Sequence, residues 1–351
     1  MKHIIGGNLR PEPAEVKTVL VDVEDAGQRL DNFLMRQLKG VPKTHVYRII
    51  RSGEVRVNKG RASVDRRVEA GDQVRLPPVR TSQRAHTKAL EMAAGAALGQ
   101  LPDAAPGAAD RPAPAREFPV LFEDEFFLAI NKPAGVAVHG GSGVSFGVIE
   151  QLRMARPQAR FLELVHRLDR ETSGILLVAK KRSALKNIQD QFRERETGKT
   201  YLALVEGEWP TRLKVLDKPL HKYLLPDGER RVKVVAKDHP DAMQSLTLVQ
   251  RVRSAGGFSL LEVTLKTGRT HQIRVHLASE GMPIAGDEKY GNFERNKSLQ
   301  RAGVVVPLRR MFLHAWRLQF KHPLDGRRVE LLAVLPADLQ QFLDYVAPTT
   351  S

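Results

Sequence analysis

A short polar segment between two apolar runs constrains the fold of this 351-residue chain more than any other feature. Residues 166–174 read HRLDRETSG, an apolar-rich run precedes them at 161–165, and the run ILLVA follows at 175–179. Apolar runs of this length predict short buried strands. The polar segment is therefore expected at the end of a sheet, where binding and catalytic residues are commonly located.

Asp169 is the candidate reactive group of this polar segment, as residues 166–174 are called from here on. Arg167 and Arg170 flank it, and nearby guanidinium groups favour the ionised carboxylate, which suits a nucleophile better than a general acid. Charged clusters in loops also form structural ion-pair networks. The pattern alone leaves a catalytic and a structural role open.

The composition predicts a polyanionic partner. The chain has 56 Lys and Arg against 40 Asp and Glu, a formal net charge of +16, and nucleic acid is the first candidate. No apolar run approaches the length of a membrane-spanning helix, and residues 1–11 lack the apolar core of a signal peptide. We therefore expect a cytoplasmic protein without membrane contact.

The absence of cysteine excludes thiol catalysis, disulfides and thiolate metal sites. Histidines are the remaining soft ligands, and His271 and His276 are five residues apart, whereas a spacing of four would align two imidazoles on one helical face. The sequence predicts neither a metal nor a cofactor.

Shifts in composition divide the chain into four segments. Residues 81–116 are rich in Ala and Pro without sustained apolar periodicity, so they cannot bury enough surface to offset their ordering entropy and are expected to form a linker. We predict an N-terminal extension over 1–26, a small basic domain over 27–80 and a larger domain over 117–346.

The small domain is expected to contain two helices followed by a strand. Apolar residues recur at helical spacing on both sides of residues 40–42 (GVP), and residues 52–60 alternate between apolar and charged types. Lys43, Arg48 and Arg51 lie on or just before the second helix. They could form a solvated helix face, but like charges crowded on a small domain favour contact with phosphates.

The larger domain is predicted to have an α+β fold. Strands are expected at 126–130, 200–205, 242–252, 258–266, 312–320 and 328–334, with a helix at 183–193. Many strands with few helices between them favour a mixed, largely antiparallel sheet. Thr270 as N-cap and Gly281 as a stop predict a short helix over 271–280, with Arg269 and Arg274 near its beginning.

Four motifs of the larger domain together resemble those of the RluA family of pseudouridine synthases. They are NKPAG at 131–135, HRLDRETSG at 166–174, KTY at 199–201 and GRTHQIRVH at 268–276. The small domain resembles the S4 RNA-binding module through RIIRSGEVRVN at 48–58. With this module in front, the chain most resembles the RluC subgroup, which acts on large-subunit ribosomal RNA.

The resemblance implies isomerisation of specific uridines in large-subunit (23S) ribosomal RNA, either free or in an assembling ribosomal particle, without a cofactor. It implies that Asp169 is the catalytic aspartate, that Tyr201 is the active-site tyrosine and that Arg274 pairs with the aspartate. An ionised carboxylate could act as a nucleophile at C1′ or as a base at C2′, and the sequence leaves both routes open. Tyr201 offers a flat face for the uracil and a hydroxyl near C5.

A base inside an RNA stem must be extruded to reach such a site. Arg167 matches the family residue that fills the resulting gap, and its planar guanidinium can stack on bases. A surface arginine paired with Glu171 is the competing interpretation of Arg167. Arg269 and His271 are further expected RNA contacts.

Two other function classes fit the sequence less well. A glycosidase or nucleoside hydrolase also cleaves a glycosidic bond, but a second carboxylate has no clear candidate and a strongly basic chain has no reason to bind a neutral sugar. An RNA-binding assembly factor would explain the charge but would leave Asp169, Tyr201 and Arg274 without a purpose. Nothing in the sequence demands a dimer, so we expect a monomer.

Overall fold

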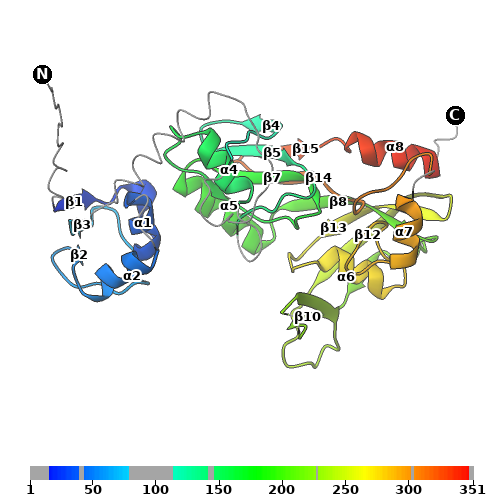
Figure 1. Ribbon diagram of the computed structural model, residues 1–351, viewed down its shortest axis with the longest axis horizontal. Coiled ribbons are helices and arrows are strands. Elements are labelled where there is room, and N and C mark those ends of the chain that lie inside the picture. Colours follow the sequence, from blue (N-terminus) through cyan, green and yellow to red (C-terminus); the bar gives the residue numbers. More distant parts are fainter. Residues whose placement is uncertain are drawn as a thin grey trace, which may run out of the picture. The chain divides into compact units, whose positions relative to one another are not determined.

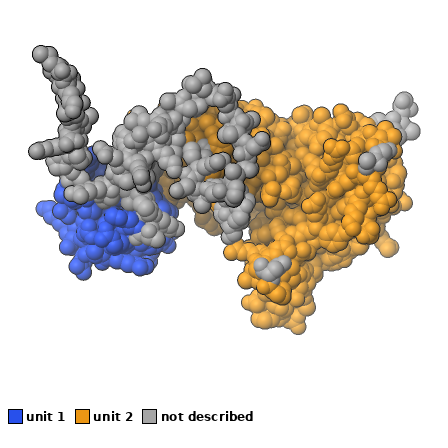
Figure 2. All heavy atoms as spheres, viewed as in Figure 1, with its two compact units in different colours: residues 1–106 blue, residues 107–351 orange. Residues whose placement is uncertain are grey.

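The computed structural model describes residues 16–38, 43–78, 114–140, 146–226, 228–301 and 304–347. The chain divides into two compact units, residues 1–106 and residues 107–351 (Figure 2). Most of the predicted N-terminal extension and of the predicted linker lies outside the described residues, as does the break at 40–42 between the two predicted helices.

The first unit contains two helices and a three-stranded antiparallel sheet in the order β1-β3-β2 (Figure 1). Its elements are β1 (Lys17–Leu20), the 3-10 helix η1 (Val23–Asp25), α1 (Leu30–Gln37), α2 (Lys43–Arg51), β2 (Arg56–Val57) and β3 (Gln73–Leu76). The apolar residues that recur at helical spacing, among them Phe33, Leu34 and Ile49, are buried in one core. The two predicted helices are thus confirmed.

A ten-stranded sheet forms the centre of the second unit (Figure 1). Its strands run in the order β4-β5-β7-β14-β8-β13-β12-β9, with β15 paired to β14 and β6 paired to β7. They are β4 (Val120–Glu123), β5 (Phe127–Lys132), β6 (Glu163–Leu164), β7 (Ser173–Ala179), β8 (Gly198–Glu206), β9 (Val215–Asp217), β12 (Leu246–Ala255), β13 (Phe258–Leu265), β14 (Leu313–Lys321) and β15 (Arg328–Leu332).

The predicted α+β class and the mixed, largely antiparallel sheet are confirmed. Strands β7 and β14 pair in parallel, whereas every other strand pair within the described residues is antiparallel. A separate hairpin consists of β10 (Leu220–Leu224) and β11 (Arg230–Val234). The helices of this unit are α4 (Val148–Ala155), α5 (Arg182–Glu194), α6 (Gln272–Ser279), α7 (Phe293–Gln300) and α8 (Ala337–Val346).

Helices α4 and α5 cover opposite faces of the sheet at β5 and β7. Leu128 and Ile130 of β5 pack with α4, whereas Phe127 and Ala129 of the same strand pack with α5. Successive side chains of a strand point to opposite faces, so two separate cores form on one run of apolar residues. This strand is buried on both sides, which explains why the sequence shows no apolar and polar alternation there.

The helix predicted over 271–280 begins later than expected. It runs over Gln272–Ser279, and its N-cap is His271 in a left-handed conformation with φ of 53°. The prediction of Thr270 as N-cap is therefore wrong. The side chain of Gln272 closes the preceding loop instead, because its Oε1 accepts the backbone N–H of Arg269 at 3.0 Å and the hydroxyl of Thr267 at 2.8 Å.

The parallel pairing of β7 with β14 sets the position of the polar segment. Ser173 pairs with His314 and Gly174 pairs with Ala315, which in turn pairs with Tyr201 of β8. Gly174 has φ of +111°, and a Cβ built on it would lie 2.2 Å from the carbonyl oxygen of Ala315. Only glycine permits this close approach. The polar segment and Tyr201 are therefore brought to neighbouring strands.

Candidate active site

A cleft of about 650 Å³ lies where the polar segment meets β8 and the start of α6. All six site residues that the sequence predicts for this unit line it: Arg167, Asp169, Tyr201, Arg269, His271 and Arg274. These residues come from distant parts of the chain. Asp169 and Arg274, for example, are 105 positions apart in the sequence.

Asp169 is paired with a cation from a distant part of the sequence. Arg274 Nη1 donates a hydrogen bond to Asp169 Oδ2 at 3.1 Å, and His271 Nε2 lies 3.9 Å from the same oxygen. The neighbouring Arg170 does not take this role, because its Nε donates to the carbonyl of Gly135 at 3.0 Å. The prediction that the guanidinium groups of both Arg167 and Arg170 flank the Asp169 carboxylate is therefore wrong with respect to Arg170.

Arg167 is exposed at the cleft, and its guanidinium forms no hydrogen bond or ion pair with any residue that the structure describes. The competing interpretation, an ion pair with Glu171, is not observed. Glu171 pairs instead with Arg170, whose Nε lies 3.4 Å from Glu171 Oε1.

A buried carboxylate holds Arg274 from the side away from Asp169. Asp287 accepts Arg274 Nε at 2.8 Å and Nη2 at 2.7 Å, and it also accepts the backbone N–H groups of Lys289 at 2.8 Å and Tyr290 at 3.1 Å. Burial acts to raise the pKa of Asp287, but the hydrogen bonds and charge of Arg274 lower it overall. The sequence did not single out Asp287.

The charge state of Arg274 is fixed by the same contacts. Burial acts to lower the pKa of this guanidinium, but Asp287 and Asp169 together raise it above its ordinary value. Arg274 is therefore a permanent cation whose remaining N–H group is directed at Asp169. Asp169 thus has a fixed cation at hydrogen-bonding distance.

Tyr201 enters the cleft from β8. Its hydroxyl forms no hydrogen bond to a residue within the described ranges, and burial together with the charge of Asp169 raises the pKa of Tyr201 above its ordinary value. The phenol is therefore neutral near pH 7. A flat ring with a free hydroxyl beside an ionised carboxylate can stack on a planar ligand and exchange a hydrogen bond with it.

Lys132 ties the polar segment to the end of β5. Its side chain is fully buried, and its Nζ donates to the carbonyls of Pro133 at 2.9 Å, Val136 at 2.8 Å and Arg170 at 3.0 Å. Burial lowers the pKa of Lys132 to about 7, although the nearby Glu171 acts to raise it. A lysine at the end of an apolar run, directly before Pro133, was the signal in the sequence for this anchor.

A second buried anchor involves Ser173 and His314. Ser173 Oγ lies 2.8 Å from His314 Nδ1 and accepts a hydrogen bond from Arg310 Nη2 at 2.6 Å, while His314 Nε2 lies 3.0 Å from the carbonyl of Ala333. The pair has the residue types of a nucleophile and a base. Neither residue lines the cleft, and both are fully buried, so their role is to hold the end of the polar segment.

Of the predicted RNA contacts in the first unit, Arg48 and Arg51 are exposed on α2, and Lys43 begins that helix. Arg48 Nη2 lies 3.2 Å from His45 Nε2, and the guanidinium of Arg51 lies 5.9 Å from the ring centroid of Tyr47. Contact of these cations with phosphates stays a prediction.

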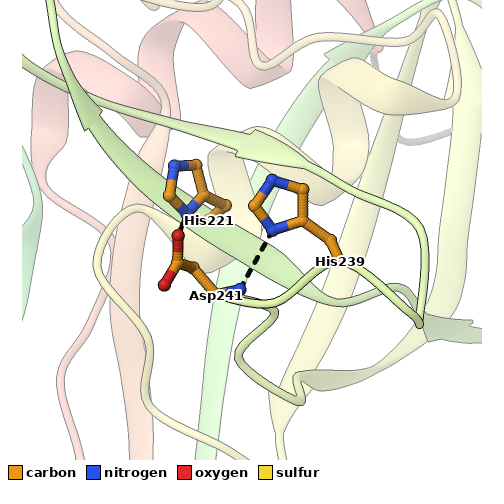
Figure 3. A group of neighbouring side chains, drawn as sticks. All are labelled: His221, His239 and Asp241. Carbon is orange, nitrogen blue, oxygen red and sulfur yellow. Dashed lines mark hydrogen bonds and ion pairs between the residues drawn. The ribbon is translucent and has the colours of Figure 1, made fainter.

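One group of side chains in the described part of the chain could bring three metal ligands together (Figure 3). His221, His239 and Asp241 have ligand atoms within 4.8 Å of one another. However, His239 Nδ1 already accepts the backbone N–H of Asp241 at 3.1 Å, and the Asp241 side chain is 71% exposed. None of the three lines the cleft, and the group lacks the orienting hydrogen bonds that metal ligands usually have.

No helix among the described residues is both long and apolar enough to cross a membrane.

Two family models match the two units. Residues 126–279 match the model for RNA pseudouridylate synthase, and residues 28–74 match the model for the S4 domain. The first match covers the polar segment, Tyr201 and Arg274. The second covers α1, α2, β2 and the first two residues of β3, but not β1.

Curated relatives are similar over nearly the whole chain. Ribosomal large subunit pseudouridine synthase C of Escherichia coli strain K12 is 47% identical over 336 residues, which are 95% of this chain and 98% of that protein. The protein of the same name from Pasteurella multocida is 46% identical over 332 residues, 93% of each chain.

Solved structures resemble about two thirds of this chain in fold. Human RNA pseudouridylate synthase domain containing 4 has a TM-score of 0.52 at 28% identity and covers 64% of this chain and 91% of its own. Human RNA pseudouridylate synthase domain containing 1 has a TM-score of 0.52 at 27% identity, with 64% and 86% covered.

Proposed function

This chain belongs to the RNA pseudouridylate synthase family, and we propose that it converts specific uridines of large-subunit ribosomal RNA to pseudouridine with Asp169 as the catalytic carboxylate. The observation that carries the assignment of Asp169 is its 3.1 Å hydrogen bond from Arg274 in a cleft that Tyr201 also lines.

Three observations support large-subunit ribosomal RNA as the substrate. The relatives that match 93–95% of the chain are named ribosomal large subunit pseudouridine synthases. An S4 domain precedes the second unit, and the net charge of +16 favours a polyanion over a neutral sugar. A free ribosomal RNA and an assembling ribosomal particle both fit these observations.

The reaction divides naturally among the residues of the cleft. The bond between C1′ and N1 breaks, the uracil turns, and C5 joins C1′, so the base needs a flat surface and the ribose needs an ionised oxygen. Asp169 supplies that oxygen, either as a nucleophile at C1′ or as a base at C2′. Arg274 places a positive charge against it and aims it, and Tyr201 supplies the flat surface and a hydroxyl where the proton leaves C5.

The target uridine must leave its stack to enter the cleft, which costs about 3 kcal/mol. Arg167 is the residue we assign to the vacated position in the RNA. It is exposed at the mouth of the cleft and has no protein partner among the described residues, so its guanidinium is available to stack on the neighbouring bases.

The remaining contacts are with the RNA backbone. Arg269 and His271 at the cleft, and Lys43, Arg48 and Arg51 on α2, are the residues we assign to binding RNA. A cytoplasmic location and a monomeric state stay predictions.

The test is an assay for pseudouridine in large-subunit ribosomal RNA after incubation with purified full-length protein. We expect the wild type to form pseudouridine and Asp169→Asn to form none while binding RNA with nearly unchanged affinity, because affinity comes mostly from phosphate contacts. Glu171→Gln is the matched control. It removes a carboxylate from the same segment that does not line the cleft, and it should remain active.

The same assay separates the alternatives. Equal modification by wild type and Asp169→Asn would disprove the catalytic assignment. Binding by both proteins without modification would favour an assembly factor, and release of free uracil would favour a hydrolase.

A further inference from the structure

His271 has a backbone conformation that few residues other than glycine adopt. Its φ is 53°, in the left-handed region, directly before α6. Such conformations are costly and persist where surrounding contacts hold them, often at functional sites. The side chain of His271 is only 16% exposed, and it lines the cleft beside Asp169.

A chain of hydrogen bonds favours one nitrogen of His271 as the site of its proton. The backbone N–H of Val232 donates to the hydroxyl oxygen of Tyr290 at 3.1 Å, and this hydroxyl lies 2.8 Å from His271 Nδ1. With its oxygen accepting from Val232, the hydroxyl still has its own proton available to donate to Nδ1. A neutral imidazole that accepts at Nδ1 carries its proton on Nε2.

The charges around the ring favour the same state. Nε2 faces Asp169 Oδ2 at 3.9 Å, and the opposite tautomer would direct a lone pair at this carboxylate. Burial lowers the pKa of His271, Arg274 and Lys289 act in the same direction, and Asp169 and Asp287 oppose them. The ring is therefore a neutral N–H donor near pH 7.

We propose that His271 and Asp169 together bind the 2′-hydroxyl group of the target uridine. Nε2–H is a donor and the carboxylate is an acceptor, and their nearest atoms are 3.9 Å apart, so one oxygen atom can lie within hydrogen-bonding distance of both. A hydroxyl satisfies both groups at once, because it accepts from Nε2–H and donates its proton to Asp169.

The position of the 2′-hydroxyl in the substrate agrees with this contact. It is attached to C2′, the neighbour of C1′, and both routes open to Asp169 bring its carboxylate to one of these two carbons. The 2′-hydroxyl is also the group by which a protein distinguishes RNA from DNA. The inference rests on the proposed function, since it requires a uridine bound with its ribose against Asp169.

The first test measures the preference for ribose at the target position. Full-length wild type and variants are given, under single-turnover conditions, a fragment of large-subunit ribosomal RNA in which the target residue is uridine or 2′-deoxyuridine. The variant is His271→Asn, since asparagine tolerates the left-handed backbone and its short side chain cannot reach the ribose oxygen. The matched control is His239→Gln, which does not line the cleft.

We expect wild type and the control to react at least about tenfold faster with uridine than with 2′-deoxyuridine, the size expected for one hydrogen bond to a charged or buried partner. In His271→Asn most of this preference should disappear. An unchanged preference in His271→Asn, with an active wild type, overturns the inference and leaves the proposed function intact. A wild type that isomerises no uridine overturns both.

The second test determines the tautomer without substrate or activity. Nitrogen NMR of the histidine-labelled full-length protein should show the Nε2–H form for His271, identified by the signal that His271→Asn removes. Tyr290→Phe keeps the ring, whose centroid lies 5.1 Å from the Arg274 guanidinium, but removes the hydroxyl, and it should mix the two tautomers. An Nδ1–H form in the wild type overturns the inference.

Discussion

At the scale of single residues, the cleft depends on one arginine held between two carboxylates. Arg274 bonds Asp287 through two N–H groups and Asp169 through a third, with only 8% of its side chain exposed. Asp169 lines the cleft and Asp287 does not. Because two bonds to Asp287 fix the plane of the guanidinium, Asp287 is a positioning residue that acts through Arg274.

Asp287→Asn should lower kcat for pseudouridine formation about a hundredfold, because a shift of about 1 Å in a reacting or aiming group can cost that much. RNA affinity should change little. The control is Glu288→Gln, which removes the neighbouring exposed carboxylate. Single-turnover rates and equilibrium binding separate the two effects, and equal rates for the two variants would contradict the positioning role.

The buried His314 makes the second unit sensitive to acid. Burial lowers its pKa to about 4 in the folded protein, from 6.5 for a free imidazole. Between these values the unfolded chain binds more protons than the folded chain, so stability rises with pH across this window. The contribution of neutral His314 to the free energy of unfolding is fully present above about pH 6.5. It is lost as the pH falls toward 4, by up to about 3 kcal/mol.

This loss of stability can be followed with urea unfolding at about pH 7.5 and about pH 4.5. These two conditions span most of the range between the pKa values of His314 in the folded and unfolded protein, and each pKa unit corresponds to about 1.36 kcal/mol. Both tryptophans of the chain, Trp209 and Trp316, lie in the second unit, so their fluorescence reports on it. His314→Asn should lose less stability than the wild type between the two conditions. An equal loss would show that other groups dominate.

At the scale of elements, the junction of β7 and β14 determines where the polar segment lies. The two strands pair in parallel at Ser173 and Gly174, Lys132 bonds the carbonyl of Arg170 in the middle of the segment, and His314 bonds Ser173 near its end. The segment is therefore held by buried contacts at several points, although it is itself polar. Rigid support of this kind preserves the geometry of a site.

Gly174→Ala should destabilise the second unit by about 3 kcal/mol and abolish most activity. An added Cβ would lie 2.2 Å from the Ala315 carbonyl oxygen, and φ is +111°. Gly326→Ala is the control, since its φ is also positive, at +71°, but nothing lies within 4 Å of the added carbon. It should cost about 1 kcal/mol, the price of positive φ alone. Equal urea midpoints for the two variants would contradict the clash.

Two of the elements that sequence reasoning missed share a physical cause. Helix α7 (FERNKSLQ) buries only Asn296, and the hairpin of β10 and β11 has mostly exposed or half-buried residues, so neither has an apolar periodicity to detect. The strands β8, β13 and β14 were predicted because their apolar runs are buried in the sheet. An apolar pattern in the sequence can reveal a helix or strand only where one face of that element is buried.

At the scale of the whole molecule, the charge of the small unit should contribute to RNA affinity independently of the chemistry. The double variant Arg48→Gln/Arg51→Gln should weaken binding and reduce the slope of log affinity against log salt by about 2, one for each lost phosphate contact. Filter binding of ribosomal RNA across a range of salt concentrations measures both quantities.

The control for this prediction removes the same charge from the second unit. Lys181→Gln/Lys297→Gln changes one half-buried and one exposed lysine, neither of which lines the cleft. If this variant changes the salt dependence as much as the α2 variant, then binding follows total charge and α2 has no special part in it.

The sequence by itself determined the class of the fold, the existence of a basic N-terminal module and the position of the polar segment around Asp169, because apolar periodicity, charge and contiguous motifs are local properties. Only the tertiary structure decided that Arg170 bonds the carbonyl of Gly135 instead of Asp169, and that Asp287, Lys132 and His314 support the site. These contacts join residues 13 to 141 positions apart, as in Arg274 with Asp287 and Ser173 with His314. Chain folding brings such residues together, and no local pattern in the sequence encodes which partners meet.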